Sequence, residues 1–253
     1  MSLRRLLREI PFARRIYAET FVFRYVKEKV FLHPTSFAQA GEDLKVQELI
    51  GNVSYFIDIG AHDGISGSNT FYFALRGARG ACFEPVKETF SRLASLYRLN
   101  SKIICRNCAI SDVNRHAEIM AADFHSYIPD TEDQRHTDLS RSGFLVPPRS
   151  EQISLLTFDT AISELDPPRE IDLLSIDVED HELKVLTSIP FEKFSFRVIV
   201  VETHLFDVQK NELKWQHRDI DQINDLLRQS GYHLVAQSWV NSLYMQTDTP
   251  FRN

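Results

Sequence analysis

Three short, almost uninterrupted apolar runs constrain the fold of this chain most: SYFIDIG at 54–60, IDLLSIDVE at 171–179 and FRVIVVETH at 196–204. A strand that is apolar along its whole length is typical of a parallel sheet with both faces covered. Weaker runs at 80–85 and 102–110 are separated by helical patterns. Repeated strand–helix–strand crossovers predict an α/β fold, with a mainly parallel sheet and helices on both faces.

The remaining periodicity fills in this frame. A polar–apolar pattern of helical period predicts helices in the following segments: 37–50, 68–78, 87–100, 181–189 and 219–231. An added strand or hairpin is expected at 116–124, and a strand running into a short helix at 153–165. The last segment, 232–246, reads as two strands with a tight turn, which predicts an antiparallel hairpin at the sheet edge.

Charge divides the chain into two parts. Residues 1–34 carry eight Lys or Arg against three Glu, although the whole chain has a net charge of −6. We interpret 1–34 as a basic amphipathic helical extension and 35–253 as one domain. We expect the extension to pack on that domain. Peripheral contact with an anionic membrane is the alternative, because the extension is basic and amphipathic. The acidic remainder argues against nucleic acid as a partner.

Other features bear on compartment and on binding loops. Three cysteines give no disulfide framework, and the pair Cys105 and Cys108 lacks further zinc ligands, so a reducing cytoplasm is expected, at its membrane face if the extension binds lipid. No run is long enough to span a membrane. The polar segment 125–150 predicts a long loop of the kind that serves as a lid or binding loop.

The turn after the first run suggests a ligand. Asp58, Gly60 and Gly64 give DxGxxxG, without the GxGxxG of a dinucleotide fold or the lysine of a phosphate loop. Acids in such a turn repel pyrophosphate but accept hydrogen bonds from an ammonium group, which S-adenosylmethionine carries. Gly60 would let the backbone approach the ligand, and the helix start at Ser68–Thr70 would receive a carboxylate.

Residues at the next two strand ends fit the same ligand. Glu84 ends the second run, where an acid can hold both ribose hydroxyls. Asn107, Ala109 and Asp112 follow the third run, where an adenine edge would be read. For Asp112, a turn or helix cap is an equal alternative.

Acidic residues gather at the ends of the last two apolar runs. Asp177, Glu179 and Asp180 follow one run, and Glu202 and His204 close the other. Buried strands seldom end in several acids for packing reasons, although Asp180 is explained equally well as a helix cap. Asp177 and Glu179 are therefore candidates to face the reacting groups. His204 is a candidate base for a hydroxyl, with a structural histidine as the alternative.

Taken together, the segments FAQAGEDL, FIDIGAHDGISGSNT, FEP, NCAISD, LLSIDVEDHELKVL and VIVVETH resemble the FkbM family of S-adenosylmethionine-dependent methyltransferases. The resemblance covers about residues 36–246. It implies a Rossmann-like class I methyltransferase fold, and it implies that Gln39, Glu42 and Asp43 flank the site. The sequence departs from the family at Asp180, where glycine is common, and at His62, to which we assign no role.

The resemblance implies transfer of a methyl group to a hydroxyl, often of a sugar, glycan or secondary metabolite. The alternatives are a catalytically silent S-adenosylmethionine-binding module of the same fold and, less favoured, a dehydrogenase. No metal ligand is assigned; Mg²⁺ held by Asp177, Glu179 and Glu202 is an open but not favoured alternative. The acceptor and the oligomeric state stay open. The residues expected to bind the cofactor are Gln39, Glu42, Asp58, Gly60, Ala61, Asp63, Gly64, Ser68, Asn69, Thr70, Glu84, Pro85, Asn107, Ala109 and Asp177.

Overall fold

The computed structural model describes residues 36–121, 126–129, 149–207 and 212–247 of the chain. The predicted basic extension at 1–34 and most of the predicted loop at 125–150 lie outside these residues. None of the helices in the described part has the length and apolar character of a membrane span.

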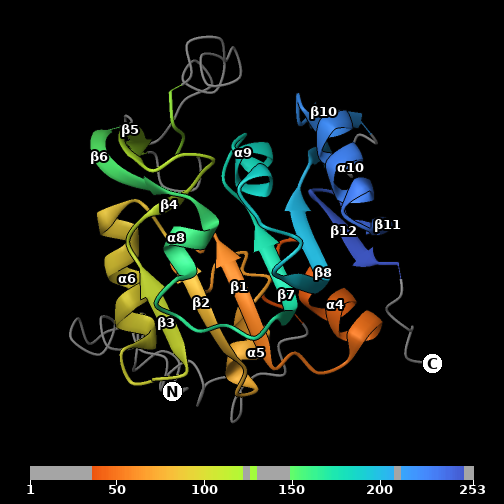
Figure 1. Cartoon of the computed structure of the whole chain (residues 1–253), viewed down its shortest axis with the longest axis horizontal. Helices are drawn as coiled ribbons and strands as arrows, with labels where there is room; N and C mark the ends of the chain where they lie inside the picture. The colour runs from red at the N-terminus through yellow and green to blue at the C-terminus, as the bar shows by residue number, and fades with distance from the viewer. Residues whose placement is uncertain (1–35, 122–125, 130–148, 208–211, 248–253) are drawn as a thin grey trace, which may run out of the picture.

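A seven-stranded sheet forms the centre of the molecule, in the order β11-β12-β8-β7-β1-β2-β3 (Figure 1). Its strands are β1 (Tyr55–Ile59), β2 (Arg79–Phe83), β3 (Ile103–Arg106), β7 (Glu170–Ile176), β8 (Ser195–Glu202), β11 (Tyr232–Gln237) and β12 (Asn241–Gln246). The first five run parallel, and β12 joins β8 in the antiparallel sense. The predicted α/β class, with a parallel sheet and an antiparallel C-terminal hairpin, is confirmed.

Helices cover both faces of this sheet, as the apolar runs require. One face packs against α4 (Glu42–Ile50), α5 (Phe71–Leu75) and α6 (Lys87–Tyr97) through a core that includes Phe56, Phe71 and Leu93. The other face packs against α8 (Phe158–Ile162), α9 (Glu182–Thr187) and α10 (Ile220–Gln229). Side chains alternate along each strand, so neighbouring residues of one strand contribute to different cores.

A small second sheet corrects part of the prediction. It consists of β4 (Ala109–Ile110), β6 (Arg149–Leu156) and β5 (Arg115–Ala121), in that order. The run at 102–110 is therefore two strands in different sheets, and the strand expected at 153–165 lies outside the central sheet. Figure 1 shows this small sheet beyond the carboxyl ends of the central strands. A separate core of Val86, Ile119, Ile153 and Leu155 holds it there.

Two further boundaries differ from the prediction. The run at 196–204 ends its sheet strand at Glu202, and a short hairpin of β9 (His204–Asp207) and β10 (Glu212–Gln216) follows, which the sequence pattern did not indicate. The helix expected at 37–50 begins only at Glu42, because Gly41 adopts a left-handed backbone with φ of 83°. Residues 36–41 thus form an irregular segment that leads into α4.

The turn after β1 approaches the backbone that follows β7 closely. Gly60 has φ of 86°, and a Cβ there would lie 1.7 Å from the main-chain oxygen of Asp177. The N–H groups of Gly60 and Ala61 both donate to Phe83 O of β2, at 3.0 Å. A side chain at position 60 would therefore push the turn after β1 away from Asp177. The same movement would disturb the two hydrogen bonds to Phe83 O.

Replacing Gly60 with Ala should destabilise the protein far more than the same change at Gly231. Both glycines have φ of 86°, but a Cβ at Gly231 would meet nothing within 4 Å. Each variant costs about 1–2 kcal/mol of left-handed strain, and Gly60→Ala adds at least about 2 kcal/mol from the backbone clash. Urea unfolding of the two variants measures the difference. Equal losses would show that β1 and β7 separate easily at this point.

Candidate functional site

A single cavity lies at the carboxyl ends of β1, β2, β7 and β8, where ligands of open α/β sheets bind. Most of the predicted site residues line it: Gln39, Asp58, Gly60, Ala61, Ser68, Asn69, Glu84, Pro85, Ala109, Asp177 and Glu179. The others lie outside the lining: Glu42, Asp63, Gly64, Thr70, Asn107 and His204. The topology thus brings segments 140 residues apart in the chain, from Gln39 to Glu179, around one space.

Asp58 ends β1 inside the core, with only 4% of its surface exposed. Thr70 Oγ1 donates to its carboxylate at 2.5 Å, which ties the strand to the start of α5. Burial raises the pKa of Asp58 to about 6, against hydrogen bonds from Thr70 and Ser175 that lower it. Burial under the glycine turn thus favours the protonated form of Asp58 more than water would.

Glu84 follows β2 and is 6% exposed. Each of its carboxylate oxygens accepts one main-chain N–H, from His62 at 3.1 Å and from Val86 at 2.8 Å. These bonds orient the carboxylate, and a carboxylate oxygen can accept more than one hydrogen bond. Burial raises the pKa of Glu84 to about 7, so a ligand that donates hydrogen bonds to this group would stabilise its charged form.

The start of α5 corrects one expectation. Ser68 Oγ accepts the N–H groups of Thr70 at 3.2 Å and of Phe71 at 3.0 Å. These donors, which were expected to receive a ligand carboxylate, already have a partner inside the protein. The helix is also short, with only five residues, so it has little dipole to offer. Ser68 and Asn69 line the cavity with their own atoms instead.

Asn69 supplies the test of whether the cavity suits S-adenosylmethionine. Its side chain is 5% exposed and donates through Nδ2 to Ser175 Oγ at 3.1 Å. Its Oδ1 is buried without a hydrogen-bond partner in the structure. A buried amide oxygen without a partner is unfavourable, and a ligand in the neighbouring cavity could supply the missing hydrogen-bond donor. An ammonium group is such a donor, and Glu84 offers a second acceptor for hydroxyls, so the residues fit this cofactor.

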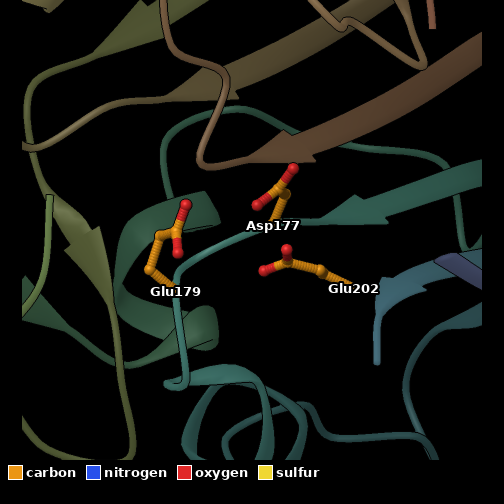
Figure 2. Close-up of side chains that lie close together, drawn as sticks. All are labelled: Asp177, Glu179 and Glu202. Atoms are coloured by element: carbon orange, nitrogen blue, oxygen red, sulfur yellow. The ribbon is translucent and has the colours of Figure 1, made fainter. Parts of the chain in front are cut away.

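Three carboxylates converge at one end of the cavity. Figure 2 shows the side chains of Asp177 and Glu179, from the segment after β7, close to that of Glu202 at the end of β8. One oxygen from each lies within 4.8 Å of the other two. Glu202 is 7% exposed, and the other two are half-buried. The acids that the sequence places at the ends of two strands thus lie close together, and Glu202 belongs to this group.

His204 is placed differently from the expectation of a base. Its Nδ1 lies 2.8 Å from Thr203 Oγ1, and its Nε2 lies 2.7 Å from the main-chain oxygen of Ser238. The ring does not line the cavity, because β8 has ended and the chain has turned toward the next hairpin. His204 therefore joins that turn to the C-terminal hairpin, and the alternative of a structural histidine describes it.

Two of the predicted residues beside the glycine turn shape it from outside. Asp63 accepts the N–H groups of Ile65 and Ser66 through Oδ1, at 2.9 and 2.8 Å. A Cβ at Gly64 would lie 2.7 Å from Leu93 and 2.8 Å from Leu96, so this glycine allows α6 to pack closely. Neither residue faces the cavity.

Asn107 also acts from outside the lining. Its Nδ2 donates to the main-chain oxygens of Glu84 at 2.9 Å and Pro85 at 2.8 Å, and so fixes the end of β2. Asp112, the other residue considered after the third run, accepts from Ser111 Oγ at 3.0 Å and does not line the cavity. The alternative of a turn residue describes its position.

Several lining residues had not been predicted. Ile119 and Ile128 form an apolar wall that comes from the second sheet and the segment after it. His181 and Ser175 also line the cavity, and His181 Nε2 lies 2.9 Å from Ser111 Oγ. His181 stands beside the acidic cluster in sequence, and that proximity was the one available signal. His62, which had no assigned role, lines the cavity with φ of 48°.

Comparison with known proteins supports one family. The model of the methyltransferase FkbM domain matches residues 58–234, which is more than half of the chain. None of the curated proteins matches this chain.

Solved structures resemble it only distantly. Methyltransferase FkbM from Methylobacillus flagellatus KT is 15% identical with a TM-score of 0.45, and the match covers 76% of this chain but only 43% of that one. The ribosomal protein L11 methylase from Lactobacillus delbrueckii subsp. bulgaricus is 9% identical with a TM-score of 0.42, over 81% and 76% of the two chains. Precorrin-6y C5,15-methyltransferase from Geobacter metallireducens GS-15 is 9% identical with a TM-score of 0.44, and the match covers 82% of this chain and 88% of that one.

The two buried acids predict a pH dependence of stability. The pKa values of Asp58 and Glu84 are about 6 and 7 in the folded protein, above their ordinary values of 3.8 and 4.5. The folded state therefore holds protons that the unfolded chain has released. The stability from this source is full below about pH 4 and is lost as the pH rises through 6 and 7, by at most about 3 kcal/mol per group.

Urea unfolding between pH 5 and pH 8 measures this loss, and Glu84→Gln should reduce its slope. Glu192→Gln, at an exposed position, is the control and should leave the slope unchanged. If wild type and Glu84→Gln showed the same slope, Glu84 would titrate normally in the folded protein.

Proposed function

Because this chain belongs to the methyltransferase FkbM domain family, we propose that it is an enzyme that methylates a hydroxyl group of a sugar, glycan or secondary metabolite. The family is one of methyltransferases, and S-adenosylmethionine is the cofactor that its fold implies. The observation that carries the proposal is the cavity at the strand ends, where buried acceptors and a cluster of acids meet.

The donor side of the cavity is lined by hydrogen-bond acceptors. In the proposal, Glu84 holds the ribose hydroxyls with a carboxylate that two main-chain N–H groups have already oriented. Asn69 accepts the ammonium through its orphaned Oδ1. Ile119 and Ile128 provide an apolar wall suited to a base ring. When bound, S-adenosylmethionine supplies a methyl group on a sulfonium, open to attack by a hydroxyl oxygen.

The cavity as a whole is strongly acidic. Five acids line the cavity, Asp58, Glu84, Asp177, Glu179 and Glu202, and no Lys or Arg does so among the described lining residues. Such a lining repels phosphate groups, which favours a neutral hydroxyl compound over a nucleic acid or a sugar phosphate. This supports the predicted class of acceptor.

Asp177 and Glu179 are the groups that we propose to act on the acceptor. A carboxylate near the hydroxyl would orient it by accepting its hydrogen bond and would take its proton when the methyl group moves from sulfur to this oxygen, which would leave S-adenosylhomocysteine. Holding the hydroxyl in line with the donor supplies much of the acceleration. One carboxylate oxygen of Glu202 lies within 4.8 Å of one from each of these two acids, so Glu202 adds to the negative charge at this end of the cavity.

Binding of the cofactor tests the donor side. Calorimetry should show S-adenosylmethionine and S-adenosylhomocysteine binding in the micromolar range, and no binding of NAD. Glu84→Ala should weaken both by about 100-fold, since it removes hydrogen bonds to an ionised group. Glu192→Ala, on the exposed surface, is the control. A protein that bound neither compound would not be the proposed enzyme.

Transfer itself distinguishes an enzyme from a silent binding module. With tritiated S-adenosylmethionine and a panel of neutral glycosides, Glu179→Gln should lower the transfer rate by about 100-fold. Its affinity for S-adenosylhomocysteine should stay within about threefold, because the donor contacts are elsewhere. An unchanged transfer rate in Glu179→Gln would show that the Glu179 carboxylate takes no part in methyl transfer. Loss of transfer with EDTA, restored by Mg²⁺, would assign the three carboxylates to a cation instead.

A further inference from the structure

We propose that Glu42 is a positioning residue whose buried carboxylate fixes two walls of the cavity at once. One wall is the strap, residues 36–41, and the other is the hairpin turn, residues 238–241. The inference rests on the proposed function in one respect: the donor occupies this cavity. Glu42 itself does not line the cavity, so it acts through the residues that it holds.

The Glu42 side chain is buried, with 1% of its surface exposed, and receives three donors. Its Oε2 accepts the N–H of Ala40 at 2.8 Å, within the strap. Its Oε1 accepts Ser238 Oγ at 2.6 Å and Asn241 Nδ2 at 2.9 Å, both in the hairpin turn. These partners lie 196 and 199 residues further along the chain, so one carboxylate joins the two ends of the domain.

The strap carries Gln39 into the cavity wall. Ala38 forms a parallel bridge with Gly67, and Gln39 Cγ lies 3.0 Å from the position that a Cβ at Gly67 would take. Gln39 and Gly67 both line the cavity. Because Ala40 follows Gln39 directly, the bond from its N–H to Glu42 limits how far the strap can move from the glycine turn.

The hairpin turn carries a second part of the wall. Val240 lines the cavity, and its main-chain oxygen accepts the N–H groups of Thr203 at 3.1 Å and His204 at 3.2 Å. Asn241 is the antiparallel partner of Glu202, one of the three clustered acids. Directly opposed residues of two strands have neighbouring side chains. The position of the turn therefore affects where Glu202 stands.

The neighbouring acid Asp43 shows what is particular to Glu42. Asp43 is also fully buried, but it accepts hydrogen bonds from residues close to it in the chain: Ser36 Oγ, Phe37 N and Leu44 N. It therefore shapes the strap alone. Only a carboxylate accepts at both oxygens, so an amide at position 42 would turn a donor toward either the strap or the hairpin turn.

Hydrogen exchange tests the link without any ligand. In Glu42→Gln, we expect peptides covering 36–41 and 238–241 to exchange at least about tenfold faster than in wild type. Asp172→Asn is the matched control. Asp172 also accepts main-chain N–H groups, from Ser54 at 2.7 Å and Tyr55 at 3.1 Å. It lies near the amino end of β7, whereas the cavity lies at the carboxyl ends of the strands. It should accelerate neither peptide.

Acceleration of the strap alone, or equal acceleration in Asp172→Asn, would overturn the proposal. Ser238→Ala keeps the test available if Glu42→Gln does not fold. It removes one donor from the hairpin turn, and it should still speed exchange in the distant strap.

Affinity for S-adenosylhomocysteine tests the consequence for the site. In the wild-type background, Glu42→Gln should weaken binding about tenfold. In a protein that already carries Gln39→Ala, the same change should weaken binding by no more than about threefold, because Glu42 acts in part by holding Gln39 in place. An equal loss in both backgrounds would mean that Glu42 does not act through Gln39. If wild type bound no S-adenosylhomocysteine, the proposed function would fail, while hydrogen exchange would still decide whether Glu42 joins the two walls.

Discussion

The parallel pairing of β1 with β7 is the contact on which the rest of the site depends. Asp177 N donates to Ile59 O at 3.0 Å, directly beyond the last paired residues of the two strands. Gly60 makes this approach possible because it has no side chain to meet the Asp177 carbonyl. The turn with the buried acceptors and the segment with the clustered acids are thereby placed side by side. One backbone contact thus holds together the two parts of the cavity wall that the proposed function assigns to the methyl donor and to the acceptor.

The site is assembled at a cost in stability. Asp58 and Glu84 are buried deeply enough for their pKa values to rise to about 6 and 7, and Asn69 keeps an amide oxygen without a partner. A core chosen for stability alone would avoid such groups. In the proposed function, a ligand that donates hydrogen bonds to these groups would offset this cost.

Backbone strain is concentrated in the same region. His62, Glu179 and Asp180 adopt left-handed conformations, with φ of 48°, 55° and 73°. Asp180 stands where the FkbM family commonly has glycine, the residue that adopts this conformation without strain. The turn is nevertheless held, because Glu182 accepts the N–H of Val178 at 2.9 Å and pairs with the buried His217 at 2.9 Å. Hydrogen bonds from residues outside the turn therefore hold a conformation that glycine would adopt without such support.

The sequence alone determined the fold class and the ends of the strands that carry the site. Uninterrupted apolar runs require a sheet covered on both faces, and polar residues at their ends can only lie at its edge, as Asp58, Glu84 and Asp177 do. Local pattern does not record which distant groups satisfy a side chain. It indicated a strand at 116–124, where β5 lies, but not the separate sheet that β5 forms with β4 and β6. It also missed the engagement of both His204 ring nitrogens and the bonds from Glu42 to Ser238 and Asn241. Only the tertiary structure decided these, because hydrogen bonds between residues about 200 positions apart depend on how the whole sheet brings the two ends of the chain together.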